Sequence, residues 1–520
     1  MQSRIESACN IFTQPRHFKL RLFIEGNLIG LFTGFLIALF RYLLELSENT
    51  LPVLYNWLAA NPFFVLPWAG LLLIIGYCLA LVVRTEPMTA GSGIPQIKGI
   101  LLGKMDMNWA RVVVLKFIGA VLGIGAGLSL GREGPSVQLG ACLGQGIGRM
   151  THRSYAENHY LLTAGAGAGL AAAFNAPLAG VIFCLEELAK NFSPYVLMGA
   201  ISASVTATTV TQYFFGLEPV FHMGKIPAVY AGNIYILLIG LGAFVGILGM
   251  AFNKMLTVSL DAFKQAPLPA VLKPMLPLLL ALILGFLLPQ VLGGGSKLVD
   301  SLVVSNYTWY FLLILLLGKF FFTMICFGSG VPGGIFLPML VLGSLGGAIF
   351  AKLAVLAGIM EPQWTVNCIV FGMTAYFSAV VKSPVTGAIL IMEMTGSFEH
   401  LLALIIVSMT AYLLADILNG EPVYDMLLNR SLALQKKITD AIRHRRLMTE
   451  LVVKAGSRIA DNKVDAIAWP VNSILVNVRR GDFEITPQAD LTLKAGDYLY
   501  VLIDDNKKLE LMSLNKELPA

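Results

Sequence analysis

The sequence predicts an all-α, polytopic membrane protein followed by a small soluble α+β domain. Only 13% of the 520 residues are charged and 56% are hydrophobic, whereas a soluble protein of this size carries roughly 25% charged residues. Apolar runs of about 20 residues, the length that crosses a bilayer as a helix, recur along most of the chain. After Arg430 the composition becomes polar. The net charge of +6 fits cytoplasmic loops and tails, and no nucleic-acid partner is expected.

The apolar segments predict a series of membrane helices. The first, residues 16–46, opens with basic residues and should therefore begin in the cytoplasm. Residues 1–16 have neither an apolar core nor a small-residue cleavage site, so no signal peptide is expected. Many later segments are short or contain glycine or proline, which predicts tilted and re-entrant helices. These segments are 67–83, 112–148, 160–188, 196–215, 234–252, 275–292, 310–327, 330–353, 366–381, 385–394 and 401–418.

An internal repeat divides the membrane part into two halves, residues 20–215 and 230–430. Segment 175–186 matches segment 382–393, since a proline, a glycine and a glutamate keep the same offsets. Chance similarity among apolar helices is the alternative, but a second match in the same order favours duplication. Duplicated halves with broken helices in corresponding places predict a binding site between the halves, near the midplane. The second match pairs Pro135, Leu139 and Gly140 with Pro338, Leu342 and Gly343.

Residues 131–136, GREGPS, place an arginine and a carboxylate between two apolar runs. Charged groups at membrane depth cost about 2.5–3.5 kcal/mol each and normally mark an ion or proton path. The flanking glycines let backbone N–H groups approach a ligand closely, and Pro135 fits the first turn of a helix that begins here. Because helix N-termini bind anions, the stretch predicts an anion-binding helix start that carries a removable acid, Glu133. A short surface loop is the alternative.

Further broken segments contain residues suited to ion binding or proton transfer. Residues 91–95 offer the hydroxyl of Ser92 as an anion ligand, and a plain turn is the alternative interpretation. Residues 333–338 form a second glycine-led helix start, and a capped helix end is the alternative there. The pair Glu186 and Glu187 ends an apolar helix, where acids are more often functional or ion-paired than idle. Tyr424 alone indicates only an interfacial anchor.

Residues 91–95 (GSGIP), 131–135 (GREGP) and 334–338 (GIFLP) resemble the three signature motifs of the CLC family of chloride channels and chloride/proton antiporters. They occur in that family's order and at similar separations, and the resemblance covers residues 20–430. It implies an inverted-repeat bundle of tilted and re-entrant helices in a homodimer with one pore per subunit. It also implies a multi-pass protein in the lipid of the cell (inner) membrane, with both termini cytoplasmic.

The resemblance further implies roles for single residues. Glu133 would be the gating glutamate, which competes with chloride when deprotonated and swings away when protonated. Glu187 would be the internal proton-transfer glutamate that distinguishes antiporters from channels in this family. The backbone of Arg132 and Gly134 would line an outer anion site. Chloride would be held by hydroxyl and backbone groups of Gly91, Ser92, Ile335, Phe336 and Tyr424.

The physical argument agrees with that resemblance. Partial positive charge from several helix starts can hold a dehydrated anion without a full countercharge that would trap it. A carboxylate in that field competes with the anion, and a proton that neutralises the carboxylate links anion occupancy to protonation. Serine at position 92 goes with chloride preference in this family. Gln96, where many relatives have glutamate, lies past the ion ligands and changes only local charge.

These features predict a secondary active transporter that exchanges chloride for protons, with a passive gated chloride channel on the same fold as the alternative. An intramembrane enzyme is not expected, because there is no HExxH motif, there are no paired membrane aspartates, and no histidine lies inside the bundle helices. The six cysteines form no CxxC pair and predict neither a metal site nor a disulfide. No cofactor is expected beyond the transported chloride and protons.

The polar C-terminal part predicts a separate domain. Residues 431–448 are a basic linker that includes Lys436, Lys437, Arg443, Arg445 and Arg446. Residues 449–520 contain alternating runs at 473–478 and 498–502 that predict strands. This part resembles the TrkA C-terminal type of regulatory domain, in segments 479–481, 485–487 and 494–497. The resemblance implies a cytoplasmic regulatory or dimerising domain, with an unidentified small-molecule effector.

Overall fold

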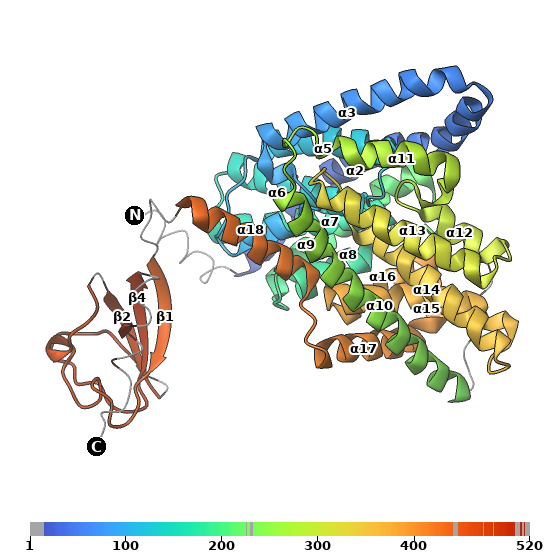
Figure 1. Cartoon of the computed structure of the whole chain (residues 1–520). Helices are drawn as coiled ribbons and strands as arrows, with labels where there is room; N and C mark the ends of the chain where they lie inside the picture. The colour runs from blue at the N-terminus through green and yellow to red at the C-terminus, as the bar shows by residue number, and fades with distance from the viewer. Residues whose placement is uncertain are drawn as a thin grey trace. The chain divides into compact units, whose positions relative to one another are not determined.

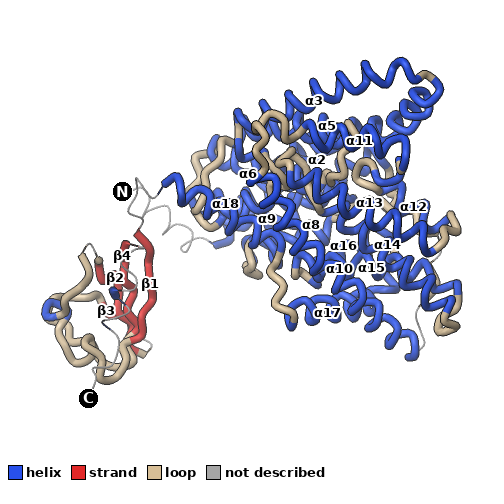
Figure 2. Tube along the Cα trace, in the orientation of Figure 1, coloured by secondary structure: helices blue, strands red, loops and turns tan. Residues whose placement is uncertain are grey.

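The membrane part and the tail form two compact units, Met1–Arg430 and Ser431–Ala520. The computed structural model describes residues 15–224, 226–228, 232–439, 446–471, 473–481, 483–504, 510–511 and 514. In the described residues the first unit is built from helices, and the strands lie in the second (Figure 2). The predicted fold class, a helical membrane bundle with a small strand-containing domain after it, is confirmed.

The helices of the first unit pack side by side in one bundle, coloured from blue to orange along the chain in Figure 1. These helices form two runs along the chain, before and after residue 225. The first run is α2 Pro15–Ala60, α3 Val65–Thr85, α4 Ile94–Leu101, α5 Trp109–Gly125, α6 Glu133–Met150, α7 Tyr155–Phe174, α8 Pro177–Phe183 and α9 Pro194–Phe215. The second is α10 Gly232–Gln265, α11 Met275–Leu287, α12 Ser296–Val304, α13 Trp309–Gly328, α14 Phe336–Leu356, α15 Thr365–Val381, α16 Pro384–Thr395 and α17 Leu401–Ile417.

Several helices are short, as the glycines and prolines of the sequence predict. The segment 112–148 consists of two helices, because the chain turns at Gly127, where φ is +96°. The segment 160–188 is divided at Asn175, which adopts a left-handed conformation, and it ends in a π-helical turn, Cys184–Leu188. The first helix is longer than its apolar run and continues to Ala60. Among the described residues, seven helices are long and apolar enough to cross a membrane.

Small residues bring helices of the bundle interior into backbone contact. A Cβ atom on Gly140 of α6 would lie 2.1 Å from the carbonyl oxygen of Gly165 on α7. The second half repeats this contact, because a Cβ on Gly343 of α14 would lie 2.5 Å from the carbonyl oxygen of Gly372 on α15. Any side chain at these positions would separate the helices. The glycine-rich segments therefore form close helix pairs in both halves, as expected of small residues in membranes.

The repeated glutamates link the two halves reciprocally. The carboxylate of Glu186 accepts hydrogen bonds from the backbone N–H groups of Val385 and Thr386, 3.2 and 2.6 Å away, at the start of α16. The carboxylate of Glu393 accepts from Leu178 and Ala179, 3.1 and 2.8 Å away, at the start of α8. Each half thus supplies the acid that satisfies the free N–H groups of the other half's broken helix.

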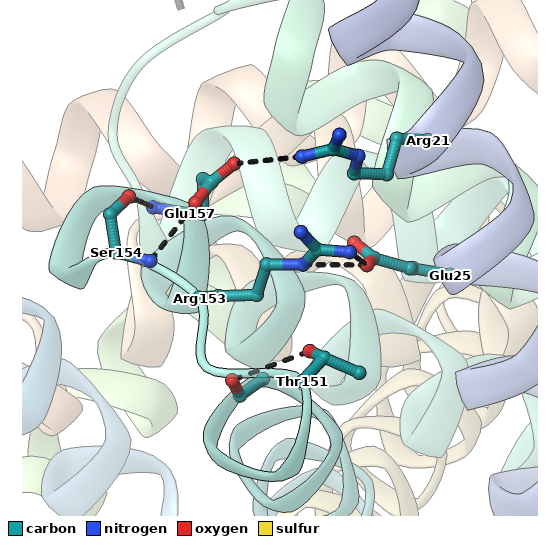
Figure 3. Close-up of polar contacts among 7 residues, drawn as sticks. Arg21, Glu25, Thr151, Arg153, Ser154 and Glu157 are labelled. Atoms are coloured by element: carbon teal, nitrogen blue, oxygen red, sulfur yellow. Dashed lines mark hydrogen bonds and ion pairs between the residues drawn. The ribbon is translucent and has the colours of Figure 1, made fainter. Parts of the chain in front are cut away.

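Ion pairs fix the start of α2 to the connection between α6 and α7 (Figure 3). Arg153 points toward Glu25 and donates from Nε to its Oε1 at 2.7 Å. Arg21 faces Glu157 at 3.9 Å. Glu157 also forms a capping box with Ser154 at the start of α7. One basic residue at the start of α2, Arg21, and one acid of that helix, Glu25, therefore each have a partner of opposite charge near the start of α7.

Helix α18, Val423–Thr439, continues past Arg430, the last residue of the first unit. It occupies the first nine residues of the segment predicted as a linker, 431–439. Their sequence, SLALQKKIT, contains good helix formers and no glycine or proline, so the helix has no local reason to end at Arg430. Two of the predicted linker arginines, Arg443 and Arg445, lie outside the described residues.

The second unit contains a four-stranded antiparallel sheet in the order β1-β4-β2-β3. The strands are β1 Arg446–Val452, β2 Ile474–Arg480, β3 Phe483–Ile485 and β4 Tyr498–Asp504. Alternate residues of β4, Leu499, Val501 and Ile503, are fully buried and form the core of this unit. Arg480 makes a two-pronged ion pair with the buried Asp497, with N–O distances of 2.8 and 2.7 Å. Both predicted strands are present.

Candidate ion pathway

Three glycine-rich loops, distant in sequence, meet at one place through backbone hydrogen bonds. The N–H of Gly131 donates to the carbonyl of Gly334 at 2.6 Å, and the N–H of Gly334 returns a bond to the Gly131 carbonyl at 2.8 Å. The N–H of Gly333 donates to the carbonyl of Gly91 at 3.0 Å. These loops lead into α4, α6 and α14. The positive ends of three helices are thereby joined, which favours an anion between them.

The close approach of these loops requires glycine at position 134. A Cβ atom there would lie 2.4 Å from Oγ of Ser92 and 2.7 Å from its carbonyl oxygen. On the other side, a Cβ on Gly334 would lie 3.0 Å from the backbone nitrogen of Gly134. The motif glycines thus let the first turn of α6 contact both neighbouring loops.

Glu133 lies at this meeting point and is fully buried. Its Oε2 accepts a 3.3 Å hydrogen bond from the N–H of Leu337 in the first turn of α14. Its Oε1 has no partner among the described residues. A carboxylate here occupies a position at which a helix start attracts any anion.

Two hydroxyl groups lie buried and unpaired near the same site. Ser92 is 2% exposed and Tyr424 is fully buried, and neither hydroxyl has a hydrogen-bond partner in the described part of the chain. Tyr424, in the first turn of α18, is close enough to Glu133 and Glu187 for both carboxylates to act on it electrostatically. Since buried hydroxyls without partners are destabilising by about 1–3 kcal/mol each, these two are suited to a ligand.

The start of helix α14 presents further backbone N–H groups beside these loops. Ile335 precedes the helix and Phe336 begins it, and both are fully buried. The first N–H groups of a helix have no partner within the helix. Phe336 also packs on Phe174 and Phe377, with ring centroids 5.4 and 4.8 Å apart. The start of α14 is therefore both rich in donors and held rigidly.

Glu187 lies in the π-helical turn after α8 and is 2% exposed. Its Oε1 accepts a 2.7 Å bond from Nζ of Lys98, and its Oε2 accepts a 2.7 Å bond from Oγ of Ser383. A second buried acid is thus present, held by partners from α4 and from the residue before α16.

The chain resembles known transporters along most of its length. A sequence model described as "Voltage gated chloride channel" matches residues 70–416. The chain belongs to the voltage gated chloride channel family. A TrkA-C domain follows at residues 448–514.

Relatives in this family are named as exchangers. The H(+)/Cl(-) exchange transporter ClcA of Vibrio cholerae is 37% identical over 427 residues, which are 79% of this chain and 89% of that protein. The protein of the same name from Salmonella paratyphi B is 35% identical over 432 residues, 80% of this chain and 90% of the relative.

Solved structures of antiporters share the fold of this chain. A slow cyanobacterial Cl⁻/H⁺ antiporter superposes with a TM-score of 0.73 at 34% identity, over 80% of this chain and 99% of that one. A CLC-type fluoride/proton antiporter superposes with a TM-score of 0.63 at 24% identity, over 76% of this chain and 95% of that one, and shares the fold.

In this family member the side chain of Arg132 contacts α2. It donates to Oε1 of Glu45 on that helix at 3.3 Å, and Glu45 also pairs with Arg41 at 3.4 Å. The Nε of Arg132 has no hydrogen-bond partner in the described part of the chain, so α2 engages this side chain only in part. Sequence analysis did not identify Glu45, although its position as an acid within the first apolar helix was a usable signal.

Two buried lysines, also missed from sequence, hold the loops at the helix starts. Nζ of Lys116 donates to the carbonyls of Thr89 and Gly91, 2.9 and 2.6 Å away. In the other half, Nζ of Lys319 donates to Val291 and Gly293, 3.0 and 2.6 Å away. Both side chains are fully buried. A lysine in the middle of an apolar helix was the signal that sequence analysis did not use.

Proposed function

We propose that this protein is a secondary active transporter that exchanges chloride for protons and needs no cofactor. The observation that carries the proposal is the pair of buried carboxylates, Glu133 and Glu187, with the buried hydroxyl of Tyr424 within electrostatic reach of both. One acid among helix starts would suffice for a gate, whereas proton transfer through the membrane part needs acids at successive depths. Relatives named as H(+)/Cl(-) exchange transporters support this function.

Chloride is coordinated in this proposal by the groups that the protein leaves unpaired. The hydroxyls of Ser92 and Tyr424 donate to it, and the N–H groups of Ile335 and Phe336 complete the site. Gly91 borders the inner end. The backbone of Arg132 and Gly134 lines an outer anion site at the start of α6. Support comes from the joined helix starts, whose partial charges attract an anion without trapping it.

Glu133 acts as the gate. Its carboxylate accepts the N–H of Leu337 and so occupies the positive end of α14. Chloride and the carboxylate are then competitors for one position. Protonation removes the negative charge, weakens the hydrogen bond from Leu337, and frees the position for chloride, so each proton taken up is linked to anion movement.

Glu187 transfers protons between Glu133 and the cytoplasmic side, and this role favours the exchanger over a passive gated channel on the same fold. Lys98 and Ser383 occupy both of its carboxylate oxygens. A passive channel, in which chloride passes between the helix starts, does not require a buried, hydrogen-bonded acid such as Glu187 in the turn after α8.

The assembly and location follow the family resemblance. We propose a homodimer with one pore per subunit, in the lipid of the cell (inner) membrane, with both termini cytoplasmic. The inverted halves, residues 20–215 and 230–430, form the transport domain, and residues 431–448 connect it to the tail. The TrkA-C domain regulates transport through an unidentified small molecule.

The decisive experiment follows chloride and protons together in liposomes. A chloride gradient alone should drive protons uphill in the wild-type protein. Glu187→Gln should abolish proton movement while chloride still flows, and Glu133→Ala should give chloride flux that no longer responds to pH. Glu361→Gln, an exposed acid bonded to Gln363, is the matched control and should behave as wild type. Chloride flux without uphill proton movement in the wild type would establish the passive channel instead.

A further inference from the structure

A chain of alternating charges connects Glu187 to the exposed surface. Lys98 bonds to Glu187 at 2.7 Å and also forms an ion pair with Asp425 of α18. Asp425 in turn pairs with Lys190 at 2.6 Å. Exposure rises along this series, because the side chains of Glu187 and Lys98 are 3% and 4% exposed, while those of Asp425 and Lys190 are 28% and 54% exposed.

The charges that act on Glu187 in the described part of the chain are Lys98 and Lys190, which attract its negative charge, and Asp425, which repels it. Helices α7 and α9 also pack against the π-helical turn, and neither adds a charge at Glu187 among the described residues. The neighbouring Glu186 is turned toward the start of α16. Ser383 and Tyr424 are neutral groups on the other sides.

Lys98 is therefore shared between two carboxylates. It satisfies the ionised form of Glu187, since an ammonium group can only donate a hydrogen bond. Asp425 opposes this effect in two ways. Its carboxylate forms an ion pair with the same Lys98 ammonium, and its negative charge repels that of Glu187. An opposite charge at this distance typically shifts a carboxyl titration by one to three pH units, roughly, toward acid.

We propose that Lys98 is a positioning residue that keeps Glu187 ionised until a proton arrives from the cytoplasmic side. Asp425 reduces the stabilisation that Lys98 gives to the ionised carboxylate. The pair would thereby set the internal pH range in which exchange runs. This inference rests on the proposed exchange function. It assigns Lys98 and Asp425 to the control of proton uptake and leaves the chloride ligands unchanged.

The test measures exchange in liposomes against the pH on the side of Lys190. Lys98→Met removes the attraction and should move the midpoint of the pH dependence upward by at least about one unit. Asp425→Asn removes the competitor and should move it downward. Both variants should still drive protons uphill, which separates them from Glu187→Gln. Opposite shifts from two contacting residues are not expected of a merely structural role.

The matched control is Lys352→Met, since Lys352 bonds to Asn306 and has no contact with Glu187. Its midpoint should equal that of the wild type. An unshifted midpoint for Lys98→Met, or a shift in the same direction for both variants, overturns the proposal. Loss of proton movement in Lys98→Met with chloride flux intact also overturns it, because Lys98 would then be an obligatory proton carrier.

A second measurement keeps this inference separate from the proposed function. Infrared difference spectra against pH, assigned with Glu187→Gln, report the protonation of Glu187 without any transport. The carboxyl band should appear at higher pH in Lys98→Met and at lower pH in Asp425→Asn. If the wild type moves no protons uphill, the exchange function fails, yet these spectra still decide the role of Lys98. Identical spectra for wild type and Lys98→Met refute it.

Discussion

Gly134→Ala tests the close approach of the first turn of α6 to the loop that carries Ser92. The added methyl group would lie 2.4 Å from Oγ of Ser92, 2.7 Å from its carbonyl oxygen and 3.1 Å from its Cα. Two of these atoms belong to the backbone, so a change of rotamer at Ser92 cannot relieve the clash. The loop at residues 91–93 must therefore move away from the helix start.

The size of the effect follows from the cost of overpacking. Forcing a methyl group into a tightly packed site costs about 1–3 kcal/mol, and each 1.4 kcal/mol corresponds to a tenfold change in affinity, roughly. Chloride binding requires the original position of the Ser92 hydroxyl, so the variant must restore the clash in order to bind and the strain falls on the chloride-bound state. Chloride binding should then weaken by about 5- to 140-fold.

Isothermal titration calorimetry of chloride binding to the purified protein measures this change. Gly70→Ala is the matched control, because a Cβ atom at that position in α3 has nothing within 4 Å. This control should bind chloride as the wild type does. Unaltered affinity in a folded Gly134→Ala protein would refute the argument that Ser92 and the start of α6 share one anion site.

Three further predictions concern other parts of the chain. Tyr424→Phe removes only the unpaired hydroxyl and should weaken chloride binding about tenfold or more, since hydrogen bonds to charged groups contribute about 1.5–3 kcal/mol; calorimetry that shows no loss would remove Tyr424 from the site. A protein that ends at Gln435 should still carry chloride in liposomes, because every proposed ligand precedes Arg430; a dimer that folds but is inactive would show that the tail takes part in transport. In the tail, burial acts to raise the pKa of Asp497, but hydrogen bonds from Arg480 and the Lys494 backbone outweigh it and hold that pKa below its ordinary value. This stabilisation is complete above the unfolded pKa, near about 3.9, and is lost as pH falls through the folded pKa. The hydrogen-exchange protection factors of the sheet residues should therefore fall below about pH 4, and Asp497→Asn should remove that acid-dependent step; an identical pH profile in the variant would contradict the assignment.

The sequence by itself determined which segments are apolar enough to cross a membrane, because apolar length and composition are local properties. The divisions of segments 112–148 and 160–188, at Gly127 and Asn175, came only from the structure. The three glycine-led helix starts, in contrast, were evident in the sequence, because a glycine before a helix needs no distant partner. The predicted bounds and the structure differ where composition changes gradually, as at α18, which continues into the predicted linker.

The tertiary structure alone decided which partners these residues meet. Lys98 and Glu187 are separated by 89 positions, and Glu187 and Ser383 by 196, yet both contacts measure 2.7 Å. The reciprocal capping by Glu186 and Glu393 likewise joins the two halves. The spacing of apolar residues in the sequence identifies the buried face of a helix, but it does not identify which group of another helix contacts that face. Buried charges in an apolar bundle require partners, and only the packing of helices within each half and between the two halves determines which groups those are.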